Sequence, residues 1–119
     1  MSALFDRYLI VDWSAAGTPV RGANSIWWAE WHREGGLVAR ENPPTRAEAM
    51  TQIATRLADA IASGARVLTG FDFPFGYPAG FARRLGGDWR TLWARIEEGL
   101  EDAPDNTNNR FDLAGRFNA

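Results

Sequence analysis

Apolar residues gather in two short runs of the chain, and each run leads to an aspartate. Tyr8–Val11 precedes Asp12, and Val67–Phe71 precedes Asp72. Apolar runs of this length are typical of buried strands. A carboxylate at the end of a buried strand is costly to desolvate unless it has a partner. The pattern therefore predicts two strands, each ending in an acidic side chain that needs a partner.

The residues after the first run predict a loop and two more strands. Residues 15–24 are small and polar and are interrupted by Gly and Pro, as in a loop. Ser25–His32 alternates and carries three tryptophans, which favours a strand. Gly35 and Gly36 predict a turn, and Leu37–Glu41 can return as a third strand. We therefore expect a three-stranded antiparallel meander.

A long amphipathic helix is predicted next. Thr45 and Glu48 have the spacing of a capping box, with Thr45 as N-cap. Apolar residues then follow the i, i+3, i+4 spacing of one helix face as far as Ser63 and Gly64. They are Ala47, Met50, Ile53, Ala54, Leu57, Ala58 and Ile61. A helix between two strands makes them parallel through a right-handed crossover, so the strand at 67–71 is expected beside an earlier strand.

The rest of the chain has a mainly helical pattern. Residues 73–81 are aromatic and Gly-rich, and a short helical turn is expected through Arg83 and Arg84. Asp88 predicts the N-cap of a second long helix. Its shared face carries Trp89, Leu92, Trp93, Ile96 and Leu100. A polar loop leads to a last helix, after which no C-cap or strand follows. We therefore expect a fragment of a longer domain, truncated before a fifth strand.

The order strand, strand, strand, helix, strand, helix is that of the ribonuclease H-like fold. Residues 1–119 are accordingly predicted to form a single α/β domain of that class. Parallel neighbours lie about 4.8 Å apart, and side chains alternate between sheet faces. Ile10, Asp12 and Ser14 are expected to point one way on the first strand, and Leu68, Gly70 and Asp72 one way on the fourth, so Asp12 and Asp72 are expected at one edge and on one face. Glu48, in the first turn of the intervening helix, is expected to bring a third carboxylate. Like charges this close indicate a bound cation.

Composition excludes several classes of protein. Of the 119 residues 45% are hydrophobic and only 24% charged, which excludes a disordered chain. The absence of cysteine excludes disulfides and thiolate metal sites. A net charge of −2 disfavours a dedicated nucleic-acid binder, but not an enzyme that holds nucleic acid through metal ions. No leader pattern or membrane-spanning run is seen, which predicts a cytoplasmic protein without a membrane partner.

Four segments carry a resemblance to a known family: residues 11–16 (VDWSAA), 25–27 (SIW), 70–76 (GFDFPFG) and 109–112 (NRFD). They resemble an uncharacterised bacterial family of predicted nucleases with the ribonuclease H-like fold, some members of which carry a label from cobalamin biosynthesis. The resemblance implies a metal-dependent nuclease or phosphodiesterase that hydrolyses a phosphodiester with two cations about 4 Å apart.

The resemblance also implies roles for particular side chains. Asp12 would bridge the two ions, Asp72 and Glu48 would each hold one, and Asp112 is a reserve ligand. Oxygen ligands in a chain without cysteine favour Mg²⁺ or Mn²⁺. Ser14, Asn109 and Arg110 are candidates for contact with a substrate phosphate, Arg being suited to a bidentate contact. The implied substrate is a nucleic acid or a smaller phosphoester.

Each acid also has a purely structural explanation. Asp12 can cap the loop after its strand, and Asp72 can be a turn residue before Phe73 and Pro74. Glu48 is accounted for by the capping box, and Asp112 by the first turn of the last helix. His32, the only histidine, is interpreted as a surface or packing residue.

Two other functions stay open. Residues 12–18 with Arg21 faintly resemble the first phosphate loop of sugar kinases and actin-like ATPases, which would make the protein a nucleotide-dependent phosphotransferase; such a loop needs Gly where Ser and Ala stand. A non-catalytic binding module would use the aromatic residues between Phe73 and Tyr77 for stacking.

The arginines at 83, 84, 90 and 95 alternate with acids and are interpreted as a solvated helical face. An open sheet edge favours self-association into a homo-oligomer.

Overall fold

The computed structural model describes residues 4–119, which divide into two compact units. The first unit extends to Asp72 and takes in Pro104–Asn106, and the second comprises Phe73–Ala103 and Thr107–Ala119. Each unit has buried apolar residues of its own. The single domain expected for the whole chain stays a prediction. Within residues 4–119, no helix is both long enough and apolar enough to cross a membrane.

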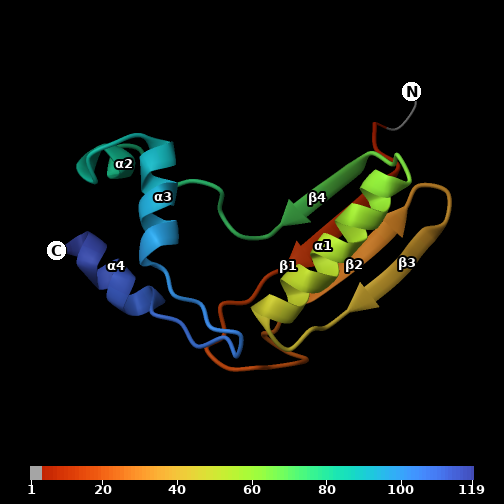
Figure 1. The fold of residues 1–119 in the computed structure, drawn as a ribbon, viewed down its shortest axis with the longest axis horizontal. Coiled ribbons are helices and arrows are strands. Elements are labelled where there is room, and N and C mark those ends of the chain that lie inside the picture. Colours follow the sequence, from red (N-terminus) through yellow and green to blue (C-terminus); the bar gives the residue numbers. More distant parts are fainter. Residues whose placement is uncertain (1–3) are drawn as a thin grey trace. The chain divides into compact units, whose positions relative to one another are not determined.

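The first unit is a four-stranded sheet with one long helix (Figure 1). Its elements are β1 (Arg7–Asp12), β2 (Trp27–His32), β3 (Gly36–Glu41), α1 (Arg46–Ala62) and β4 (Val67–Phe71). The strands lie in the order β3-β2-β1-β4, and only the β1–β4 pair is parallel. The predicted meander and the parallel crossover strand of a mixed α/β fold are confirmed. The ribonuclease H-like identity stays a prediction.

The strand boundaries on both sides of the loop between β1 and β2 differ from the prediction. β1 ends at Asp12 instead of including Ser14, and β2 begins at Trp27 instead of Ser25. Both serines donate their hydroxyls to loop carbonyls, Ser14 to Asn24 at 3.0 Å and Ser25 to Gly22 at 2.6 Å. Such local bonds compete with a strand ladder, so the loop is longer than expected.

The core of the first unit lies between α1 and one face of the sheet (Figure 1). Its buried residues are Leu9, Val11, Ile26, Trp28, Ala49 and Ile53. The hydroxyl of Thr45 accepts the backbone N–H of Glu48 at 3.2 Å, which confirms the predicted N-cap. The helix ends at Ala62 with Ser63 as its C-cap, and Gly64 follows with φ of 72°, a left-handed conformation that glycine adopts readily. Local sequence signals thus fix both ends of α1.

The other face of the sheet carries Asp12. Leu9 and Val11 point toward α1, so alternation turns Ile10 and Asp12 to the opposite side. On β4 the same alternation places Gly70 on that side, where a Cβ would lie 3.3 Å from Cδ1 of Ile10. Ile10 is 55% exposed. Asp72, two residues beyond Gly70, continues this face of the sheet.

The second unit is helical. It contains α2 (Phe81–Arg84), α3 (Trp89–Gly99) and α4 (Arg110–Asn118). The carboxylate of Asp88 accepts the backbone N–H groups of Arg90 and Thr91, both at 3.0 Å, as its predicted N-cap role requires. Leu113 of α4 packs so closely on Gly99 that a Cβ there would meet it at 2.6 Å. Glycine at the end of α3 therefore permits the contact between α3 and α4.

Candidate metal centre at the ends of β1 and β4

Asp12 and Asp72 meet at the carboxyl ends of two parallel strands. Val11 and Phe71 form the last pair between β1 and β4, and an aspartate follows each. The backbone N–H of Asp72 donates to the carbonyl of Val11 at 3.3 Å, and Oδ1 of Asp72 accepts the N–H of Trp13 at 2.7 Å. Asp72 is thereby held against β1, and its carboxyl lies within hydrogen-bonding reach of Asp12. The structure brings these two predicted site residues together.

The proximity of the two acids changes the proton affinity of Asp12. The hydrogen bond that a protonated Asp12 makes to the Asp72 carboxyl raises the pKa of Asp12, and slight desolvation and charge repulsion raise it further. Among residues 4–119, no arginine forms an ion pair with either aspartate. An exposed carboxylate pair without a counter-charge fits a hard divalent cation, since Mg²⁺ commonly binds one or two carboxylates and completes its shell with water and phosphate oxygens.

The loop after β1 is fixed by a buried arginine and a buried asparagine. The guanidinium of Arg46 donates to the carbonyls of Ala16 and Asn106 at 2.8 and 2.7 Å, and to that of Ser14 at 3.3 Å. Oδ1 of Asn106 accepts the backbone N–H of Arg46 at 2.8 Å, and its Nδ2 donates to the carbonyl of Thr18 at 3.1 Å. Both side chains are at most 8% exposed. Together they attach the loop that follows Asp12 to the first turn of α1.

Sequence reasoning missed both of these positioning residues. Arg46 stands at the first helical position, directly after the N-cap, where a buried arginine is not expected. Asn106 lies in a polar loop and has a left-handed φ of 72°. An asparagine in such a loop is only a weak indication of a positioning role, because Asn is common in turns for local reasons. Only the fold brings Asn106 into contact with Arg46, which is sixty positions away along the chain.

A hollow of about 480 Å³ lies beside Asp12. Its walls come from the two ends of the loop that joins β1 to β2, with Trp27 at one side. Trp27 pairs with Asp12 in the register of β1 and β2, and its indole N–H donates to the carbonyl of Gly22 at 3.1 Å. The amide of Asn42 accepts the N–H of Gly22 at 2.7 Å and donates to the carbonyl of Ile26 at 2.6 Å. The hollow therefore has walls fixed by hydrogen bonds.

Glu48 does not join the pair. It belongs to α1, which covers the Leu9 and Val11 face, whereas Asp12 points to the opposite face of the sheet. Its carboxylate accepts the side-chain amide of Gln52 at 3.2 Å. Across residues 4–119, no three His, Cys, Asp or Glu side chains gather in a group able to hold a metal ion. The expected third carboxylate is therefore not supplied by Glu48, because alternation along β1 separates the two faces.

Ser14 lies next to the hollow, but its hydroxyl is engaged in the loop. It donates to the carbonyl of Asn24 and accepts the N–H of Ala16 at 3.3 Å. The structure therefore assigns Ser14 a part in shaping the loop. Contact of Ser14 with a substrate stays a prediction.

The three remaining candidates lie in the second unit. The side chain of Asn109 accepts the N–H of Glu101 at 2.9 Å and donates to the carbonyl of Gly99 at 2.9 Å, so it ties the start of α4 to the end of α3. The guanidinium of Arg110 lies over the ring of Phe111 at 4.7 Å, and its buried Nη1 has no hydrogen-bond partner among the described residues. Asp112 is an exposed acid in the first turn of α4. Their roles in a substrate or metal site stay predictions.

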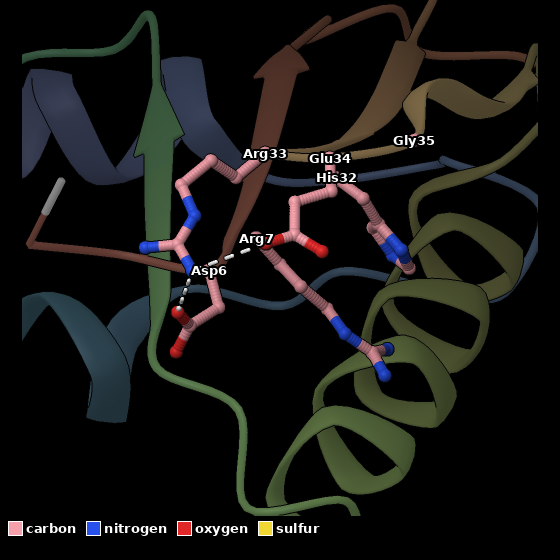
Figure 2. A pocket seen from close by; sticks show the side chains of 6 residues that line it. All are labelled: Asp6, Arg7, His32, Arg33, Glu34 and Gly35. Atoms are coloured by element: carbon pink, nitrogen blue, oxygen red, sulfur yellow. Dashed lines mark ion pairs between the residues drawn. The ribbon is translucent and has the colours of Figure 1, made fainter. Parts of the chain in front are cut away.

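A charged cluster occupies the opposite end of β1, beside a hollow of about 240 Å³ (Figure 2). The carboxylate of Glu30, only 3% exposed, pairs with Arg7 at 3.4 Å, with Arg56 at 3.5 Å and with Nε2 of His32 at 2.7 Å. Figure 2 shows the side chains of Arg7 and His32 extending toward α1. The cluster joins β1 and β2 to the helix, so His32 has the packing role predicted for it.

No protein-family model matches the chain, and no curated protein or solved structure was found to be similar to it.

Proposed function

We propose that this protein hydrolyses phosphodiesters at a divalent cation, Mg²⁺ or Mn²⁺, held by Asp12 and Asp72. The observation that carries the proposal is the contact between these two carboxyls at the ends of adjacent parallel strands. Asp72 is oriented by the N–H of Trp13, so the pair is pre-arranged instead of assembling on binding. A bound cation would supply a water of lowered pKa and would polarise the phosphoryl group.

The hollow beside the pair supports a substrate of this kind. It opens directly at Asp12, and its volume of about 480 Å³ falls within the range of small-molecule sites. The exposed edge of Trp27 gives it one apolar wall, and the loop backbone gives it polar groups. The Arg46 and Asn106 anchors hold the loop in place without contributing free charge to the site. A phosphoester with an organic substituent matches these surroundings.

Calorimetric titration with Mn²⁺ tests the cation site. The wild type is expected to bind Mn²⁺, and Asp12→Asn and Asp72→Asn are each expected to bind it at least tenfold more weakly, because each removes half of the anionic ligands. Glu41→Gln is a matched control, since it removes an exposed acid at the end of β3. Equal Mn²⁺ affinity in wild type and Asp12→Asn would rule out the carboxylate pair as the binding site.

Hydrolysis of a chromogenic phosphodiester tests the reaction. Activity is expected with Mn²⁺ or Mg²⁺, is expected to vanish in EDTA, and is expected to fall in Asp12→Asn but not in Glu41→Gln. A control with ATP separates the phosphotransferase alternative, because stabilisation against heat by ATP alone would favour that function. Metal binding without hydrolysis of any phosphodiester would refute the proposed reaction.

A further inference from the structure

A hollow of about 250 Å³ lies wholly within the second unit and is walled by aromatic rings. The rings are those of Phe75, Tyr77, Trp89 and Trp93, and small residues such as Gly76 and Ala79 leave the space between them. Phe75 is 68% exposed and Trp89 is 60% exposed. Tyr77 is held in place by ring contacts to Phe81 at 5.3 Å and to Trp93 at 5.7 Å. The hollow thus offers flat, solvent-facing rings on a fixed base.

Cationic side chains adjoin this hollow. Arg83 and Arg84 follow the lining residue Ala82 on α2, and the guanidinium of Arg90 lies over the ring of Trp89 at 4.5 Å. Among residues 4–119, none of these three arginines forms an ion pair. In the first unit, by contrast, Arg7 and Arg66 each pair with a carboxylate. These three arginines of the second unit therefore keep their charge available for a partner.

The one acid in this segment does not offset that charge fully. Between residues 75 and 93 the only acidic residue is Asp88, and its carboxylate is occupied as the N-cap of α3. The backbone N–H of Thr91 is the main reason that the pKa of Asp88 is lowered. The surroundings of the aromatic hollow are therefore cationic at neutral pH. A polyanion complements them.

We propose that this aromatic hollow binds single-stranded nucleic acid, with a base stacked on Trp89 and phosphates contacted by Arg90 and the neighbouring arginines. Exposed rings beside unpaired guanidinium groups are the combination that single-strand binders use, because every base has a face to stack and every nucleotide carries a phosphate. Proline-rich peptides also dock on aromatic grooves, but they bring no negative charge. The arginines at 83, 84 and 90 would thus bind phosphates of the ligand, instead of forming only the solvated face expected from the sequence.

The proposal does not depend on the metal centre, and its test excludes metal. The full chain is titrated in EDTA with an oligothymidylate of about ten nucleotides, a length within the range of single-strand binding sites, and tryptophan fluorescence is followed. Binding is expected, with Trp89→Ala weakening it about five- to 150-fold, the range found for loss of one base stack. Arg90→Gln is expected to weaken binding and to reduce the slope of log affinity against log salt by about 0.7.

The control variant is Trp31→Ala, which removes a 51% exposed indole of β2 in the first unit and is expected to leave affinity unchanged. Circular dichroism verifies that each variant is folded. Equal affinity in Trp89→Ala and wild type, or no binding by the wild type, would overturn the proposal. So would tighter binding of a proline-rich peptide than of the oligonucleotide. Asp12→Asn is expected to bind the oligonucleotide normally in EDTA, so failure of the metal site and failure of this site give different results.

Discussion

The pairing of two like charges predicts that Asp12→Asn stabilises the metal-free protein. The pKa of Asp12 is raised above its unfolded value, chiefly by its hydrogen bond to Asp72. A carboxyl with a raised folded pKa contributes stability at low pH and loses it as the pH rises through that pKa. At a pH above the raised pKa of Asp12, its charged carboxylate is repelled by that of Asp72 in the metal-free protein. An uncharged asparagine removes the repulsion and can donate its amide to Asp72.

The size of the effect follows from the exposure of the pair. Two unit charges about 4 Å apart repel by about 1 kcal/mol in water and more in a protein interior. Both side chains are exposed, so the value for water applies and salt reduces it further. We therefore expect a gain of about 0.5–1 kcal/mol. In a unit of this size that gain corresponds to a rise in Tm of about 2–8 °C.

Thermal unfolding in EDTA measures this gain. Asp72→Asn is expected to gain less, because the neutral amide oxygen is a weaker acceptor for the N–H of Trp13. Glu41→Gln makes the same change in net charge, from −2 to −1, and is expected to leave Tm within about 2 °C of the wild type. The advantage of Asp12→Asn should shrink as the pH falls through the raised pKa of Asp12, because protonation removes the charge of Asp12 in the wild type as well. An Asp12→Asn protein no more stable than wild type at pH 7 would show that the pair carries no repulsion.

Three further predictions concern stability. Asn106→Ala should lower the free energy of unfolding, measured in urea, by about 3 kcal/mol, because it removes side-chain hydrogen bonds of the loop and places alanine at a left-handed φ of 72°. Asn106→Gly loses the same hydrogen bonds without the backbone strain and should cost about 1 kcal/mol less. Equal costs for the two variants would contradict the strain argument. Glu30→Gln should cost about 1–2 kcal/mol, because it removes the buried charge that pairs with the partly exposed Arg7 and Arg56. Glu34 is 90% exposed, so Glu34→Gln should change stability by less than about 0.5 kcal/mol. Arg66 lowers the pKa of Asp6 from 3.8 to about 2, so the stability that this ion pair contributes should be lost as the pH falls from about 4 to 2. The difference in stability between wild type and Asp6→Asn should therefore shrink across that interval. A difference that stays constant would refute the pairing.

The sequence predicted the elements of the fold because their signals are local. The N-caps at Thr45 and Asp88 and the glycine after Ser63 act within one helical turn, and the structure uses each as expected. The apolar run before Asp12 and the helix between the two acidic strands were enough to predict a parallel pair. The meeting of Asp12 and Asp72 follows from that pairing, since both aspartates are the next residue after a paired strand position.

The contacts missed by sequence reasoning join residues that are distant along the chain. Arg46 and Asn106 are sixty positions apart, and neither stands out in its own segment. Glu30 stands where alternation from Trp28 points it into the interior, but its partners Arg7 and Arg56 come from β1 and α1. Glu48 was expected at the acidic pair because helix and strand are neighbours, yet the two side chains belong to opposite faces of the sheet.

The sequence alone therefore determined the strands, the helices and the edge at which two carboxylates meet, because periodicity and capping are properties of neighbouring residues. Tertiary structure decided which polar groups are buried, how the loop beside Asp12 is anchored, and which rings of the second unit enclose a hollow. Those outcomes depend on the burial of charges and amides against partners from other elements. A buried charge is stable only with such partners, and residues far apart in the chain supply them only once the sheet and helix have packed.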